Sequence, residues 1–122
     1  MKYIITIVVI SFSLTAGAQT ASLSDSLFVV TYTTGTAWDH TKAPGEQPYF
    51  KEHSANLSKL RKEGVIKAGA RYGEKGMIFI SAKSLSLAKD IILSDPAVIH
   101  KLFEADIQKL LVFYDGCIER PK

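Results

Sequence analysis

Residues 48–82, PYFKEHSANLSKLRKEGVIKAGARYGEKGMIFISA, decide the fold, because they contain an amphipathic helix followed directly by a hairpin. Pro48 suits the first turn of this helix, and Gly64 ends it. Four residues between them recur at three- and four-residue steps and share one side of the helix: Phe50, His53, Leu57 and Leu60. A histidine therefore interrupts an apolar stripe. A titratable imidazole at such a position indicates a specific role, either structural or functional.

Two strands are expected directly after this helix. Residues 65–71 and 76–82 are rich in strand-forming side chains, and the glycine-bounded segment 73–76 separates them. Such a short connection between two apolar runs is typical of a hairpin, so the two strands should pair antiparallel.

The chain on either side of this centre supplies one further strand before it and a helix and strand after it. Residues 27–34 predict the first strand, and residues 106–114 predict the last. Ser84 suits the N-cap of a second helix through Leu93, which the Asp95-Pro96 step breaks and restarts. The order β-α-β-β-α-β predicts an α+β, ferredoxin-like fold, a four-stranded antiparallel sheet with two helices on one face.

The second face of this sheet is expected to need a cover. In the third strand Met77 and Phe79 point away from Ile78 and Ile80, and the last strand also alternates apolar side chains on both sides. A sheet face exposed to water is normally polar, and soluble monomers rarely expose large apolar patches. We therefore expect a homodimer that packs sheet on sheet through Met77, Phe79 and the outward residues of the last strand.

The first residues of the chain predict export. Lys2, an apolar stretch of about twelve residues and Ala16-Gly17-Ala18 form the pattern of a signal peptide over residues 1–18. The alternative is an uncleaved membrane anchor, for which the stretch is short of the roughly 20 residues that a spanning helix needs. After cleavage we expect a periplasmic or secreted protein without a membrane partner. Residues 19–26 then form a flexible leader, residues 27–116 one domain, and residues 117–122 a tail with the single cysteine, Cys117.

Charge and residue spacing exclude several classes of partner. The formal net charge is only +3, and basic and acidic residues are interleaved, so no surface for nucleic acid is expected. The three histidines, His40, His53 and His100, lack the spacing of a metal site, and no metal or other cofactor is predicted.

Two segments outside the helices offer candidate ligand-binding residues. The long segment 35–47 carries Trp38 and Asp39, which suit a loop that closes over a ligand; the alternative is a Trp that packs the loop on the sheet. Arg71, at the end of the second strand, suits an anionic small molecule; the alternative is a solvated strand end.

The predicted fold is also expected to bring His53 and Asp95 together. Two antiparallel helices on one sheet face place the C-terminal end of the second beside the N-terminal end of the first. Asp95 ends the second helix, and a carboxylate there would orient the His53 ring and raise its basicity for proton transfer. The alternative is a buried histidine that is simply satisfied by a carboxylate.

The chain resembles the YCII-related family of dimeric α+β barrels over about residues 28–113. The resemblance is carried by short matches in order: Phe28-Val29-Val30, Gly35-Thr36-Ala37-Trp38-Asp39, Glu52-His53, Leu57, Leu60, Gly64, Ala68-Gly69, Ser84-Leu85 and Asp95-Pro96-Ala97-Val98. The resemblance implies a dimeric α+β barrel whose active-site pair is His53 and Asp95.

Two classes of function follow. The first is a cofactor-free small-molecule enzyme of lyase, isomerase or hydrolase type, in which His53 moves a proton, Asp95 orients it and the loop 35–47 excludes water. The second is a non-catalytic exported dimer that binds a small ligand or a partner, with His53 and Asp95 as structural polar groups.

Overall fold

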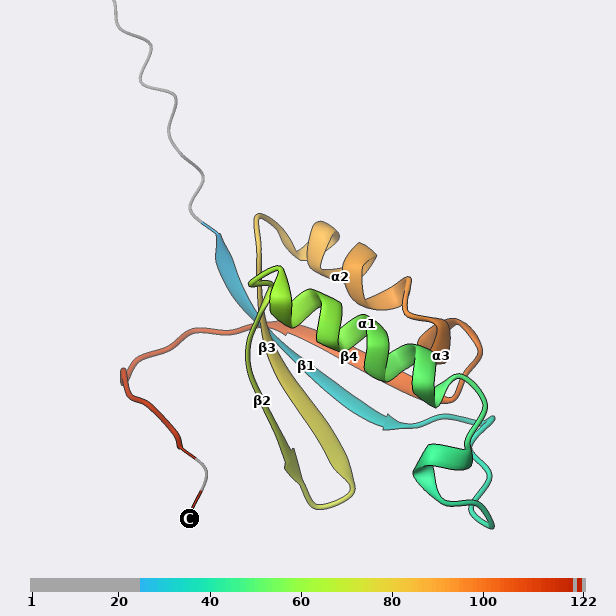
Figure 1. Cartoon of the computed structure of the whole chain (residues 1–122). Coiled ribbons are helices and arrows are strands. Elements are labelled where there is room, and N and C mark those ends of the chain that lie inside the picture. The colour runs from blue at the N-terminus through green and yellow to red at the C-terminus, as the bar shows by residue number, and fades with distance from the viewer. Residues whose placement is uncertain (1–24, 120, 122) are drawn as a thin grey trace, which may run out of the picture.

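The computed structural model describes residues 25–119 and residue 121, and within this part the fold is a four-stranded antiparallel sheet with helices on one face (Figure 1). The strands are β1 (Ser26–Thr34), β2 (Ile66–Tyr72), β3 (Lys75–Ala82) and β4 (Phe103–Lys109). The helices are the 3-10 turn η1 (Pro44–Glu46) and the α-helices α1 (Phe50–Lys62), α2 (Leu85–Leu93) and α3 (Pro96–Ile99). The predicted signal peptide 1–18 lies outside the described residues.

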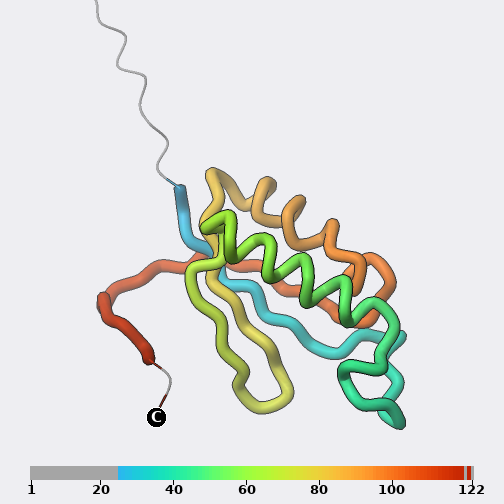
Figure 2. The backbone as a smooth tube through the Cα atoms, viewed as in Figure 1, coloured from blue at the N-terminus to red at the C-terminus, as the bar shows by residue number. Residues whose placement is uncertain are grey.

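The strand order β2-β3-β1-β4 confirms the predicted α+β class and is compatible with a ferredoxin-like arrangement. The backbone trace shows α1 and α2 lying side by side across the sheet, with the β2–β3 hairpin reaching beyond them (Figure 2). Because both helices cover the same face, that face forms the core of the molecule.

Alternation along the central strands builds this core. Phe28, Val30 and Tyr32 of β1 point toward the helices and are buried, and Ile78 and Ile80 of β3 lie beside them. The residues between them, such as Val29 and Phe79, are half-buried and belong to the opposite face. The predicted alternation of β3 is therefore confirmed.

The helix ends follow from local chemistry. Ser84 caps α2 by accepting a hydrogen bond from the Leu87 backbone N–H, as the sequence predicts. Asp95 caps α3 in the same way through the Ala97 N–H. The first helix begins two residues after Pro48, because Tyr49 adopts a left-handed backbone with φ of 65° and serves as its N-cap. Pro48 therefore precedes the helix instead of lying in its first turn.

The prediction for the last strand was wrong in its bounds. β4 begins at Phe103, and its ladder with β1 ends at the pair Phe28–Lys109, followed by one hydrogen bond from Leu110 N to Leu27 O at 2.9 Å. The apolar run that follows adds no further pairs to this ladder, although β1 itself begins at Ser26.

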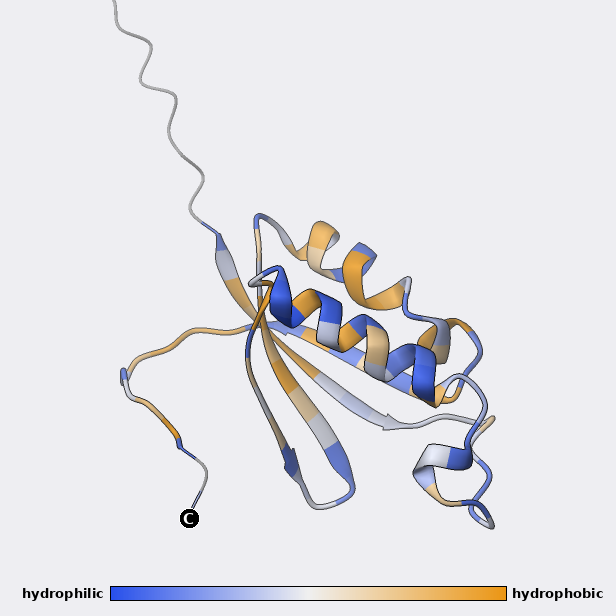
Figure 3. Cartoon of the chain, viewed as in Figure 1, coloured by the Kyte–Doolittle hydropathy of each residue, from blue (hydrophilic) through white to orange (hydrophobic). Residues whose placement is uncertain are grey.

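This correction changes the open face of the sheet. The outward residues of β4 are Glu104, Asp106 and Gln108, which are polar, and not the apolar set expected from residues 110–114. The apolar segment instead leaves the sheet as an exposed tail (Figure 3), with Tyr114 at 86% exposure. The large apolar side chains of the open face thus lie on the central strands, at Leu27, Val29, Met77 and Phe79.

Candidate functional site

A cavity of about 500 Å³ lies between α1, the β2–β3 hairpin and the loop that follows β1. Its size falls within the range of about 300–1,000 Å³ typical of small-molecule sites. Two glycines open the helix-facing side of the sheet here, because Gly76 pairs with Tyr32 and Gly69 pairs with Ile78 in the ladders. The wall is mostly aromatic and apolar with a few polar groups; its members include Tyr32, Trp38, His40, Phe50, His53, Leu57, Arg71, Glu74, Met77 and Phe103.

His53 reaches this cavity from the second turn of α1, and Asp95 supports it from behind. The distance from His53 Nδ1 to Asp95 Oδ1 is 3.1 Å, and both side chains are buried. Because a carboxylate only accepts hydrogen bonds, this geometry assigns the proton to Nδ1 and the lone pair to Nε2 in the neutral ring. No residue of 25–119 forms a hydrogen bond with Nε2, so the basic nitrogen is available on the cavity side.

Asp95 has a full set of donors. Asn56 Nδ2 donates to Oδ2 at 2.6 Å, and the Ala97 N–H donates to Oδ1 at 2.9 Å. Burial raises the pKa of the Asp95 carboxyl, but hydrogen bonds from His53, Asn56 and Ala97 outweigh burial and hold that pKa below its ordinary value. The carboxylate is therefore ionised at neutral pH and orients the imidazole.

Tyr32 lies against the other side of the His53 ring. The ring centroids are 5.3 Å apart at an interplanar angle of 80°, and the next aromatic neighbour is Phe103 at 6.1 Å. Its hydroxyl is the one buried side-chain polar atom without a hydrogen-bond partner in the described part of the chain. Burial, together with the negative charge of Asp95, raises the pKa of the Tyr32 phenol, which stays protonated.

Trp38 packs on the sheet, and its role toward a ligand stays a prediction. Its ring packs on Phe103 with centroids 5.5 Å apart, and it also lines the cavity. The loop that carries it is tied to the sheet at its start, where Gly35 N donates to Leu102 O at 2.8 Å. A Cβ on Gly35 would come within 2.1 Å of Lys101 O, so only glycine fits this contact.

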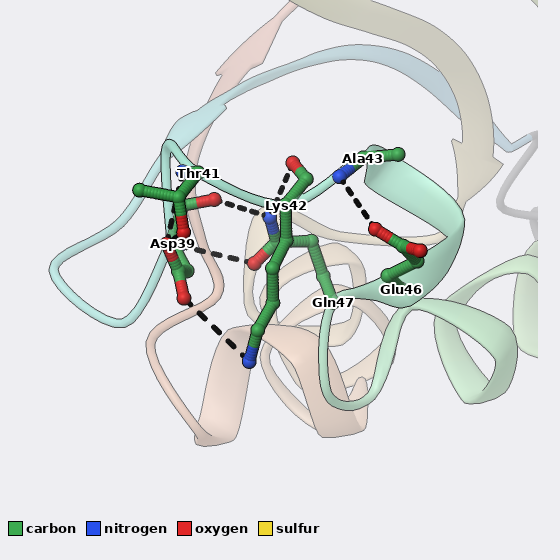
Figure 4. Close-up of polar contacts among 6 residues, drawn as sticks. All are labelled: Asp39, Thr41, Lys42, Ala43, Glu46 and Gln47. Carbon is green, nitrogen blue, oxygen red and sulfur yellow. Dashed lines mark hydrogen bonds and ion pairs between the residues drawn. The ribbon is translucent and has the colours of Figure 1, made fainter.

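Asp39, in contrast, serves the loop itself and is not among the residues that line the cavity. Its carboxylate accepts hydrogen bonds from Thr41 and lies 3.5 Å from Lys42 Nζ (Figure 4). The hydrogen bond from the Thr41 hydroxyl lowers the pKa of Asp39. The structure therefore separates Asp39 from the other predicted site residues.

Gln47 holds the loop together and was not identified from the sequence. The side chain is buried; its Oε1 accepts from Asp39 N at 3.0 Å, and its Nε2 donates to Asp39 O and Lys42 O (Figure 4). These three bonds close residues 39–47 into a compact turn, so the cavity has an ordered wall on this side.

Arg71 stands at the exposed mouth of the cavity on the helix-facing side of β2. No carboxylate within residues 25–119 forms an ion pair with it, although Glu74 also lines the cavity. Arg71 thus supplies a free guanidinium near the site, which suits the carboxylate or phosphate of a small anion.

The sequence reasoning missed Tyr32 and Asn56 as site residues. Asn56 lies three residues after His53, so both side chains leave the same face of α1, and this spacing was a readable signal. Tyr32 shares the inward register of Phe28 and Val30, so its sequence position indicated only a core residue. Its unpaired hydroxyl became visible only in three dimensions.

Within residues 25–119, no three His, Cys, Asp or Glu side chains gather as metal ligands. None of the helices described there is long and apolar enough to cross a membrane.

Comparison with known proteins leaves the site to be interpreted from its own geometry. No family model matches the chain, and no curated protein is similar enough in sequence to be matched. The resemblance to YCII-related proteins therefore stays a prediction from the short motifs described above. The structure shows a buried His–Asp pair, of which His53 lines a cavity, within an α+β fold.

Proposed function

We propose that this chain is a YCII-related, cofactor-free enzyme of lyase, isomerase or hydrolase type, in which His53 transfers a proton of a small molecule. The observation that carries the proposal is the 3.1 Å contact of His53 Nδ1 with Asp95 Oδ1 in the wall of the cavity. A contact of this kind fixes the tautomer and leaves Nε2 as a base toward the ligand.

Asp95 acts as a positioning residue in this proposal. It is 1% exposed, so it reaches a ligand only through the imidazole. Its bonds to Asn56 and Ala97 hold the carboxylate in place, so the ring it orients is held as well. Preorganisation of this type lowers the reorganisation needed during proton transfer.

The ligand is proposed to be a small anion. Arg71 supports this charge, because it lies at the mouth of the cavity with a free guanidinium. Trp38 and Phe50 add apolar walls on the loop side, and the turn held by Gln47 limits the access of water. The proposal thus combines an anionic group at the mouth with an apolar body inside.

A second copy of the chain is the proposed partner. The supporting observation is the half-buried apolar patch of Val29, Met77 and Phe79 on the face that no helix covers. Two-fold pairing would bury the same patch from both copies. Sedimentation of the mature protein at micromolar concentration tests this, with Phe79→Asp expected to give monomers or aggregates and Tyr114→Phe as a control. A monomeric wild type would contradict the dimer.

Export to the periplasm or beyond is proposed from the first eighteen residues alone. Intact-mass measurement on secreted material is expected to give a chain that begins at Gln19. A mass that includes residues 1–18 would contradict cleavage at this point.

The alternative is a dimer that binds a small ligand without turnover. The observation that favours this alternative is that Asp95 also caps α3, by accepting a hydrogen bond from the Ala97 N–H. Asp95 therefore has a structural role that does not depend on catalysis. The same cavity would then select a ligand by shape and charge, with His53 as a buried polar group.

Turnover in a panel of small esters, lactones and carbonyl compounds, followed by NMR, separates the two functions. We expect wild type and a His100→Gln control to act on the same member of the panel, because His100 is exposed outside the cavity. His53→Gln is expected to lose about 10²–10⁴-fold in rate while keeping its fold by circular dichroism. Binding without turnover across the panel, or equal rates in His53→Gln, would contradict the enzyme.

A further inference from the structure

The Tyr32 hydroxyl is the least explained polar group in the described part of the protein. Tyr32 is 6% exposed, yet no protein group within residues 25–119 pairs with its oxygen. Buried tyrosines normally find a hydrogen-bond partner, because an unpaired buried hydroxyl destabilises the folded state. A phenylalanine would fill the same space without an unpaired hydroxyl. The presence of tyrosine therefore indicates that the hydroxyl has a function.

The neighbours of Tyr32 do not use this hydroxyl. His53 faces it edge-on at 80° and uses Nδ1 for Asp95. The Asp95 carboxylate is already occupied by His53, Asn56 and Ala97. Tyr32 and His53 both line the cavity, so the free O–H and the free Nε2 are carried by two residues of the same wall.

The two free groups are complementary in their hydrogen bonding. The phenol stays protonated because burial and the charge of Asp95 raise its pKa, so it is a donor at neutral pH. The imidazole presents a lone pair at Nε2, so it is an acceptor. A ligand that suits both offers an acceptor oxygen and, close to it, a proton that can be removed.

We propose that Tyr32 is a further catalytic residue, which donates its O–H to the carbonyl oxygen of a small 2-oxo acid while His53 removes a proton from the adjacent carbon. This inference rests on the proposed function of His53. The carboxylate of the 2-oxo acid would lie at Arg71, and an aromatic substituent would lie against Trp38 and Phe50 in the wall of the cavity.

The reaction needs no oxidant, reductant or cofactor. The C–H bond beside the carbonyl breaks, its proton goes to His53 Nε2, and its electron pair forms the C=C bond of an enolate. The carbonyl π electrons move to the oxygen, where the Tyr32 O–H stabilises the developing negative charge. Return of the proton from Nε2 to carbon or to oxygen completes a keto–enol tautomerisation.

Phenylpyruvate is a direct probe, because exchange of its C3 hydrogens with D2O can be followed by NMR. Wild type is expected to catalyse the exchange. Tyr32→Phe is expected to lower kcat by about 10²–10³-fold, as for loss of an oxyanion donor, with a change in KM below about tenfold. Its Tm is expected to rise by a few degrees, because the unpaired hydroxyl is gone.

A Tyr114→Phe variant provides the matched control, because Tyr114 is exposed in the tail and does not line the cavity. Exchange in Tyr32→Phe at the wild-type rate, or a fall in its Tm, would overturn the role of the hydroxyl. Wild-type protein inert toward phenylpyruvate, yet active on another panel member through His53, would overturn the 2-oxo acid alone. Exchange that survives in His53→Gln would overturn the proposed function itself.

Discussion

The two ends of the helix-covered sheet face follow the same alternation but are filled differently. At the end where β1 begins, Phe28 and Ile80 face each other across the ladder and are 1% and 0% exposed. At the other end, the equivalent position of β3 opposite Tyr32 is Gly76. One glycine in place of a large side chain therefore converts a packed core into the wall of a cavity.

The helices match this division. Figure 3 shows α2 as largely hydrophobic and α1 as a mixture of polar and apolar residues. Ala88 and Ile92 of α2 are buried in the core, whereas the N-terminal half of α1 brings His53 and Phe50 to the cavity. Stability is thus concentrated around Phe28 and Ile80, which we call the packed end. The polar groups that could take part in a reaction are gathered around Tyr32 and Gly76, which we call the hollow end.

The packed end is expected to be the more sensitive to truncation. Phe28→Ala removes a large, fully buried side chain and should lower the free energy of unfolding by about 3–5 kcal/mol. Leu57→Ala, at a half-buried position that lines the cavity, should cost less, about 1–2 kcal/mol. Urea denaturation of both variants measures the difference. Equal losses would contradict the division between the two ends.

Asp95 is the one position of the hollow end where a large electrostatic contribution is expected. Asp95→Asn keeps the shape but removes the charge that accepts from His53 and Asn56, so we expect a loss of about 1.5–3 kcal/mol at pH 7. The folded-state pKa of Asp95 is lowered, so this stability is present above its unfolded value of about 4 and disappears as pH falls through the folded value.

The urea midpoints of wild type and Asp95→Asn should therefore converge as the pH falls below about 4. Asp39→Asn is the control, because its carboxylate lies in an exposed turn and should have the smaller effect. A difference between wild type and Asp95→Asn that is constant with pH would show that the charge of Asp95 contributes nothing.

Most of the fold could be read from local patterns. The stripe of α1, the Ser84 cap and the hairpin glycines each specify one element through their own short-range chemistry. The last strand could not be read in this way, because the apolar run after Lys109 has the stronger strand propensity. Its end is visible only in the pairing with β1, a partner about eighty residues away.

The candidate site divides along the same line. His53 and Asp95 were predictable, because the antiparallel packing of two helices brings a helix end and a helix start together. The isolation of Asp39 and the role of Gln47 were not, because the loop folds on itself through side-chain bonds to its backbone. Tyr32 was hidden because inward register alone does not distinguish a packed side chain from one beside a glycine.

Tyr32→Phe tests whether the unpaired Tyr32 hydroxyl at the hollow end lowers the stability of the protein. Removal of the unpaired hydroxyl should raise the free energy of unfolding by about 1 kcal/mol at pH 7. Because the folded-state pKa of Tyr32 lies above its unfolded value of about 10, stability of the wild type should fall further as pH rises above about 10. The advantage of Tyr32→Phe should therefore grow in alkaline solution, as measured by urea midpoints from pH 7 to pH 11. A variant that is less stable than wild type would contradict this.

Gly76→Ala should have the smallest effect on stability. It nevertheless tests whether a ligand occupies the space at the hollow end. A Cβ at position 76 would lie 3.8 Å from Tyr32 Cβ, an ordinary contact, so the variant should fold and gain about 0.5 kcal/mol through a less flexible unfolded chain. Gly45→Ala, with no atom within 4 Å of its Cβ, should give a similar gain away from the cavity wall. Only Gly76→Ala narrows the cavity beside Tyr32, so it alone should weaken phenylpyruvate binding in a calorimetric titration. Equal affinity in the two variants would mean that the ligand does not enter the space left open by Gly76.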